Sequence, residues 1–170
     1  WDIKKIEILS ESLKNKKILD FEDNNYKLFS TIKNYKLYDL LLMKIKKSKF
    51  LNFKKRFKKD QYELIINCDS TSDITKKFFS KNFYKDYESY AYSSIIKHQK
   101  IKRNNIATQV FTKNGPLAFL PISENSTSIV YSCRANKKID FKNEIKRYNV
   151  GYKIIKFSRI STSKLKFLIL

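Results

Sequence analysis

The chain has 170 residues, a formal net charge of +21, and 42% hydrophobic residues. This length fits one domain or a piece of a larger protein, and the hydrophobic content disfavours intrinsic disorder despite the charge. No apolar run approaches the roughly 18 residues of a membrane span, and one His98 with two distant cysteines excludes a zinc framework.

The basic charge comes almost entirely from lysine. Only five of the 37 basic residues are Arg, while Lys, Asn, Ile, Phe and Tyr, whose codons are rich in A and T, abound. The base composition of the gene is therefore a sufficient cause for much of the lysine excess. Because bases are read mainly by Arg, Asn and Gln side chains, the charge alone does not establish a nucleic-acid-binding function.

The cysteines and the histidine give no sign of a site. We expect Cys68 and Cys133 to be reduced thiols in strands and His98 to face the solvent. Reduced thiols predict a cytoplasmic protein, with the inner face of the membrane as a further, peripheral location.

The first 47 residues predict strands followed by a helix. The stretches IKKIEILS, KILDF and YKLFSTI alternate as strands of an antiparallel sheet do. Leu37, Leu40, Leu41 and Ile45 then recur at helical spacing, which predicts a helix from Lys36 to about Lys47 with Asn34 as its cap.

Lysines crowd between Lys44 and Lys59, with Phe50, Leu51, Phe53 and Phe57 interleaved. A solvated helix end followed by a loop or hairpin is the simpler interpretation, since charge runs usually mark solvated faces. A patch for phosphate or anionic lipid is the alternative, because basic side chains beside apolar anchors suit either surface.

A short apolar run, Leu64–Ile66, ends in polar residues up to Asp69, and a helix is predicted to begin near Ser72 or Asp73. A run of this kind favours a strand buried on both faces, as in a parallel sheet. Asp69 would then lie beyond the carboxyl end of that strand, where open α/β sheets bind ligands.

The second half of the chain predicts four strands, a helix and two strands. The strands are SYAYSSIIKH, IATQVFT, PLAFLPI and SIVYS; an amphipathic helix from about Ile139 to Tyr148 closes at Gly151, and IIKFSRIS and LKFLIL follow. This order predicts an α+β fold, with an antiparallel or mixed sheet and covering helices.

Residues 107–132, ATQVFTKNGPLAFLPISENSTSIVYS, resemble a known pattern without a gap. The pattern is Q-x-F-T-x-x-G-P-L-A-x-L-P followed by S-x-V-W-S, and it occurs in FAD-dependent aromatic-ring hydroxylases of ubiquinone biosynthesis, which are para-hydroxybenzoate-hydroxylase-like flavin monooxygenases. The polyprenyl-methoxyphenol hydroxylases are the most similar group. The matching residues are Gln109, Phe111, Thr112, Gly115, Pro116, Leu117, Ala118, Leu120, Pro121, Ser128, Val130 and Ser132.

Two upstream segments extend the resemblance. LIINCDSTSDITKK is similar to the family's second fingerprint near FAD and the nicotinamide cofactor, and TIKNYKLYDLLLMKI to its Asn-containing turn and helix. The resemblance implies substrate-domain strands in 1–33, a partial Rossmann-like FAD-binding domain in 34–86, and the substrate-domain sheet and helix in 87–170. Asn34, Asp69 and Ser70 are the implied cofactor-binding residues.

The departures from the family fall in the FAD-binding parts. Ser70 replaces the Gly of the family's Asp-Gly, Asp73 its Ser, and Lys76 its Arg. Two glycines in total leave no G-x-G-x-x-G loop for the FAD pyrophosphate. We therefore expect an internal fragment that is not active alone.

The resemblance implies an oxidoreductase that hydroxylates a polyprenylated phenol with dioxygen. The cofactors would be FAD and either NADH or NADPH, with no metal. The flavin would carry out the chemistry, so no catalytic side chain is expected. Other ubiquinone-biosynthesis proteins and an anionic membrane surface are further expected partners. By strand alternation we expect Gln109, Phe111, Leu117 and Phe119 to line an apolar substrate pocket, with Gly115 and Pro116 forming a turn close to the flavin.

Two alternative functions remain at this point. The first is a small basic nucleic-acid-binding module, in which some of the 13 Phe and 11 Tyr residues stack on bases. The second is a catalytically inactive flavoprotein-like assembly domain, which the replacements at Ser70 and Asp73 allow.

Overall fold

The computed structural model describes residues 1–169 except 24, 53–60, 70–71, 79–82 and 135–138, and it divides into two compact units. Unit 1 comprises Trp1–Ile32 and Asp86–Lys166; unit 2 comprises Lys33–Lys85 and Phe167–Leu170. The borders at 32/33 and 85/86 lie one residue from those expected from the sequence, whereas Phe167–Leu170 group with unit 2.

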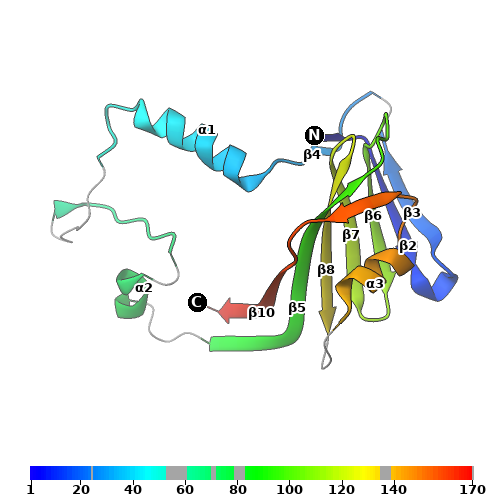
Figure 1. Cartoon of the computed structure of the whole chain (residues 1–170). Coiled ribbons are helices and arrows are strands. Elements are labelled where there is room, and N and C mark those ends of the chain that lie inside the picture. Colours follow the sequence, from blue (N-terminus) through cyan, green and yellow to red (C-terminus); the bar gives the residue numbers. More distant parts are fainter. Residues whose placement is uncertain (24, 53–60, 70–71, 79–82, 135–138, 170) are drawn as a thin grey trace. The chain divides into compact units, whose positions relative to one another are not determined.

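Unit 1 is built on a mixed sheet with strand order β10-β5-β8-β7-β6-β2-β3, and β9 pairs with β5 (Figure 1). β2 and β6 are parallel, and the other pairs from β5 to β3 are antiparallel. A short two-stranded sheet joins β1 to β4. The α+β class with a strand-rich sheet is confirmed. The strand bounds are β1 Asp2–Ile3, β2 Lys5–Ser10, β3 Lys16–Glu22, β4 Phe29–Ser30, β5 Phe83–His98, β6 Ile106–Thr112, β7 Gly115–Ser123, β8 Ser126–Arg134, β9 Ile154–Phe157 and β10 Ser161–Ile169.

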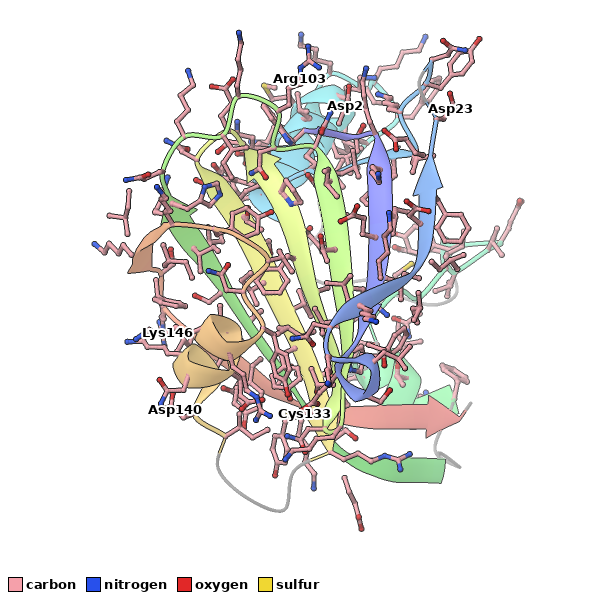
Figure 2. All side chains as sticks on the ribbon, turned by 90° about the vertical axis from the view of Figure 1, so that its right-hand side faces the viewer. Asp2, Asp23, Arg103, Cys133, Asp140 and Lys146 are labelled. Atoms are coloured by element: carbon pink, nitrogen blue, oxygen red, sulfur yellow. The ribbon has the colours of Figure 1, made fainter. Side chains whose placement is uncertain are left out.

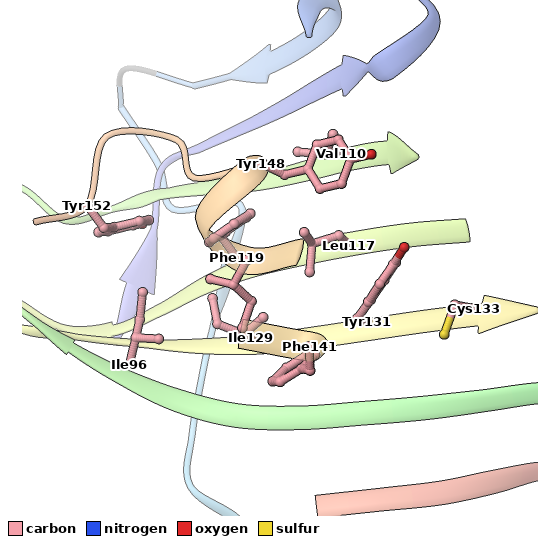
Figure 3. Close-up of a cluster of buried hydrophobic side chains, with 11 residues drawn as sticks. Ile96, Val110, Leu117, Phe119, Ile129, Tyr131, Cys133, Phe141, Tyr148 and Tyr152 are labelled. Carbon is pink, nitrogen blue, oxygen red and sulfur yellow. The ribbon is translucent and has the colours of Figure 1, made fainter. Parts of the chain in front are cut away.

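Helix α3 (Phe141–Arg147) covers one face of this sheet. Asp140 caps its first turn by accepting a hydrogen bond from the backbone N–H of Asn143 at 3.2 Å. Phe141 and Ile145 are the buried residues of the helix, and they pack into the cluster shown in Figure 3. The members from the sheet are Ile96, Val110, Leu117, Phe119, Ile129, Tyr131 and Cys133. Unit 1 therefore has a hydrophobic core of its own.

His98 does not face the solvent, as we had expected; only 2% of it is exposed. Its Nδ1 donates to the backbone carbonyl of Gln99 at 2.8 Å, and its Nε2 lies 3.0 Å from the Thr127 hydroxyl. Asn104 donates to the same hydroxyl at 3.3 Å and accepts from Tyr152 at 3.2 Å. The expectation was wrong because these polar partners satisfy the ring inside the fold.

Unit 2 contains helices α1 (Asn34–Lys46) and α2 (Asp73–Phe78). Both were predicted, but Asn34 does not cap α1: it is the first helical residue, Lys33 precedes it, and no side chain caps the helix. The predicted strand at Leu64–Ile66 is absent, and Leu64 and Ile66 are 75% and 77% exposed. A strand forms only by hydrogen-bonding to a neighbouring strand, and none of the described strands pairs with Leu64–Ile66.

The two cysteines differ. Cys133 lies in β8 and is buried, as predicted for a strand thiol. Cys68 is exposed and lies outside any strand, because the strand predicted to precede it does not form. Neither cysteine is in a disulfide.

Candidate functional site

The pairing registers of unit 1 sort its side chains onto two faces. Val110, Leu117 and Tyr131 are cross-strand partners on the face that α3 covers. Ile8, Gln109, Ala118 and Val130 are partners in the adjacent row, which points to the other face. We call this other face the open face; its central residues are Ile6, Ile8, Leu19, Phe21, Ser93, Ile95, Gln109, Phe111, Pro116, Ala118, Leu120, Ser128 and Val130. Lys97 and Arg134 follow the same register at the ends of their paired segments.

The centre of the open face is apolar and carries no charged residue. Ile8, Ala118 and Val130 are half-buried, while Phe111 is 45% exposed and Leu19 and Phe21 are each 48% exposed. The ion pairs of β2 and β3, including Lys5 with Glu22 at 3.0 Å, involve side chains of the opposite register. A face of this composition suits an uncharged, largely apolar ligand.

The structure does not bring the four expected pocket residues together. Gln109 and Phe111 lie on the open face, whereas Leu117 and Phe119 are fully buried in the core beneath α3. Strand alternation correctly predicted that Gln109 and Phe111 share one face of β6 and that Leu117 and Phe119 share one face of β7. It did not predict that these two faces are opposite faces of the sheet. The two-residue turn at 113–114 pairs Phe111 with Pro116, and therefore aligns Gln109 with Ala118.

The open-face residues of β7 that sequence reasoning missed as site residues are Ala118 and Leu120. The hairpin register was the signal that could have found them. Because Thr112 pairs with Gly115, the even-numbered residues of β7 from Pro116 to Leu120 lie on the same face as Gln109. Both residues belong to the sequence match, so the resemblance and the face coincide there.

Gly115 has a structural role within unit 1. Its φ is +138°, and a Cβ at this position would overlap the carbonyl oxygen of Ser132 and lie 3.2 Å from Cys133 Cα. The glycine is therefore required where the hairpin passes the end of β8. This contact accounts for the residue without the approach to a flavin that we had expected. Pro116, next to it, is exposed on the open face.

A cleft of about 550 Å³ adjoins this hairpin. It lies at the end of the sheet marked by Cys133 in Figure 2, while Asp2, Asp23 and Arg103 mark the other end. Lys113 and Arg134 line it together with Asn114 and Pro116, and no carboxylate is among its described lining residues. The cleft thus places Lys113 and Arg134 at one end of the open face, whose centre is uncharged.

Polar groups beneath the hairpin are tied to one another. The Thr112 hydroxyl donates to the carbonyl of Gly115 at 2.8 Å and accepts from the backbone N–H of Asn114 at 3.2 Å. Tyr131 donates to Glu144 at 3.3 Å, and burial raises the pKa of its hydroxyl. Burial also raises the pKa of the Cys133 thiol. These groups stay neutral near pH 7, so neither is an activated nucleophile or base.

The expected cofactor residues belong to unit 2. Asn34 and Asp69 are exposed, and Ser70 lies outside the described residues. The backbone carbonyl of Asp69 accepts from the Thr75 hydroxyl at 2.6 Å, and Thr75 also accepts from Asn67 at 2.6 Å. The loop before α2 is therefore organised by its own hydrogen bonds. No group of three metal-ligating side chains occurs among the residues described.

The basic segment can be described only in part, because 53–60 lie outside the described residues. No residue of α1 is buried, and Lys44 and Lys46 are in its last turn. Phe50 is 88% exposed, with the Lys49 ammonium 5.2 Å from its ring centre. We call residues 44–50 the basic segment. No described helix is long and apolar enough to cross a membrane.

No protein-family model matches the chain, and no curated protein matches it significantly. The resemblance of residues 107–132 to flavin monooxygenases stays a prediction from the sequence.

Proposed function

We propose that unit 1 is the substrate-binding part of an FAD-dependent aromatic monooxygenase, which hydroxylates a polyprenylated phenol with a reduced nicotinamide cofactor and dioxygen. One observation carries the proposal. The segment that resembles these enzymes without a gap forms three adjacent strands, β6, β7 and β8, and these strands build the centre of the open face. The resemblance and the only extended apolar face that we find in the described part of unit 1 thus coincide.

The chemistry of the face fits this class of substrate. A phenol with a polyprenyl tail is uncharged and apolar except for its ring oxygen. The centre of the face offers Phe111, Leu120 and Val130 as apolar contacts and places Gln109 among them. Binding sites for small apolar ligands are lined mainly by apolar side chains with few polar groups, and the centre of the open face has this composition.

The described residues do not supply the glycine-rich loop that binds the FAD pyrophosphate. The chain's two glycines, Gly115 and Gly151, lie at the β6–β7 turn and after α3, so no glycine-rich loop precedes a helix. The proposal therefore assigns to this chain the binding of the substrate and no step of the flavin chemistry.

The basic segment supports a second part of the proposal, contact with an anionic membrane from which a prenylated substrate can be collected. Lysines near an anionic leaflet each contribute about 1 kcal/mol, and an exposed aromatic such as Phe50 suits the interface. Binding to RNA is the competing outcome for the same lysines, and a salt-titrated binding assay distinguishes it.

Binding of 2-geranylphenol to the 170-residue chain, measured by calorimetry, tests the substrate assignment. Phe111→Lys introduces a charge on the open face and is expected to weaken binding at least about tenfold, because a buried unpaired charge is costly. Ile155→Lys is the matched control, since Ile155 is 71% exposed on β9, outside the open face. Absence of saturable binding, or equal effects of the two variants, would refute the assignment.

The reading frame on both sides of the chain tests the enzyme assignment independently. A G-x-G-x-x-G strand-turn-helix upstream and a Gly-Asp segment downstream are expected. Unrelated sequence at both borders would contradict a flavin monooxygenase.

A further inference from the structure

Gln109 is the polar side chain at the middle of the open face. In the row across the sheet, Ile8 of β2 flanks it on one side and Ala118 of β7 on the other, followed by Val130 of β8. Gln109 is half-buried, and none of the described residues hydrogen-bonds its side-chain amide. The amide carries two donors and one acceptor oxygen, all of which are left to solvent.

An amide in this position makes the face selective. An apolar ligand that covers the face removes water from Gln109, and an amide left without a hydrogen-bond partner opposes binding. A ligand that offers one hydroxyl or carbonyl at that point avoids this cost. The face therefore favours molecules with a single hydrogen-bonding group surrounded by apolar surface.

The surroundings also give the ligand a direction. Toward β2 and β3 the row continues through Ile8 and Leu19, and Phe21 lies one step along β3, so apolar contacts extend about 10 Å from Gln109 at the usual strand spacing. Toward the hairpin the face reaches Phe111 and Pro116 and then the cleft with Lys113 and Arg134. Across β7 and β8 the row continues through the smaller side chains Ala118 and Val130 to Ser93. We place the apolar tail over β2 and β3, because Leu19 and Phe21 there are large apolar side chains that are each 48% exposed.

We propose that Gln109 determines specificity by hydrogen-bonding the ring hydroxyl of the phenol, while the prenyl tail lies along Ile8, Leu19 and Phe21. This inference rests on the proposed function. It adds which side chain recognises the ring oxygen and on which side of that residue the tail lies.

Two ligands and a matched pair of variants test this role in the full chain. The ligands are 2-geranylphenol and geranylbenzene, which lacks the hydroxyl. The variants are Gln109→Leu and, as a control, Gln99→Leu, which makes the same change at an exposed residue beyond the end of β5. Leucine has a similar size and fits an apolar face, so Gln109→Leu should fold; the fluorescence of Trp1 checks this.

The wild-type chain and Gln99→Leu are expected to bind the phenol about five- to tenfold more tightly than geranylbenzene, the range of one net hydrogen bond. Gln109→Leu should lose this preference while binding geranylbenzene at least as well as the wild type. In a ¹H–¹⁵N spectrum, the side-chain amide signal that Gln109→Leu removes should shift with the phenol and stay in place with geranylbenzene.

If Gln109→Leu keeps the preference for the phenol, the inference is overturned, and the sensitivity of binding to Phe111→Lys still supports the proposed function. If neither ligand binds, or if Phe111→Lys leaves binding unchanged, the proposed function fails and the role of Gln109 fails with it.

Discussion

Replacing Gly115 with alanine tests the account of the hairpin most directly. A Cβ there overlaps the backbone oxygen of Ser132 and approaches its carbonyl carbon to 3.1 Å. The obstacle is backbone in a paired strand, so it cannot turn aside as a flexible side chain can. The φ of +138° adds strain of about 1–3 kcal/mol for any L-residue. Together, these effects predict a loss of about 3–5 kcal/mol in the free energy of unfolding.

Gly151→Ala separates the two contributions. Gly151 also has a positive φ, +101°, but a Cβ there meets no atom within 4 Å. Its replacement should therefore cost only the backbone strain. Urea denaturation followed by the fluorescence of Trp1 reports on unit 1, because Trp1 is the chain's single tryptophan and donates to the carbonyl of Asn104 there. Equal losses for the two variants would refute the argument from the contact with Ser132.

Two further predictions concern charge. The backbone N–H of Lys113 donates to Glu11 at 2.7 Å and, with further partners including Arg147, lowers the pKa of that carboxyl from its ordinary value of 4.5. A lowered pKa means that ionised Glu11 stabilises the fold above pH 4.5 and that this contribution is lost as the pH falls through the folded-state value. Glu11→Gln should therefore have a lower free energy of unfolding than the wild type near neutral pH, and the two values should converge in acid. A difference between the two proteins that stays constant with pH, measured by urea denaturation, would contradict this. Replacing four lysines of the basic segment with Glu should abolish binding to anionic vesicles, measured by flotation. The same replacement at four exposed lysines of unit 1 should leave this binding largely intact. Equal effects of the two sets would contradict the role of the basic segment in membrane binding. The two sets are Lys44, Lys46, Lys47 and Lys49, and Lys97, Lys102, Lys153 and Lys156.

Most helices and strands were predicted correctly, because periodicity and turn residues within each segment are enough to indicate them. Helix α3 was placed by its amphipathic period, and the strands of unit 1 by alternation and the turns between them. Relations between elements were harder to predict. Leu117 and Phe119 were assigned to the pocket because alternation alone does not say whether the odd-numbered or the even-numbered residues of β7 face the core. The hairpin register decides this.

The errors at His98 and at Leu64–Ile66 have a related origin. The buried ring of His98 has Thr127 as its partner, 29 positions away in the sequence, and its own strand gives no sign of that contact. Leu64–Ile66 has the composition of a central strand, but strand formation requires a partner. In α1 the predicted apolar stripe is present, yet Leu37, Leu40 and Leu41 are 43–51% exposed. Periodicity predicts the helix but not what covers it.

Asp73, which differs from the pattern that its segment resembles, has a local structural role. Asp73 is the first residue of α2, where a carboxylate is favoured by the helix dipole, and it pairs with Lys76 at 3.3 Å. Both side chains of this pair are largely exposed, so the contact adds little to stability. Among the described residues, the alternatives of a substrate-binding domain and an inactive assembly domain differ most at the open face. A substrate-binding domain needs the free amide of Gln109 in an apolar surface, whereas an assembly domain has no requirement for ligand discrimination there.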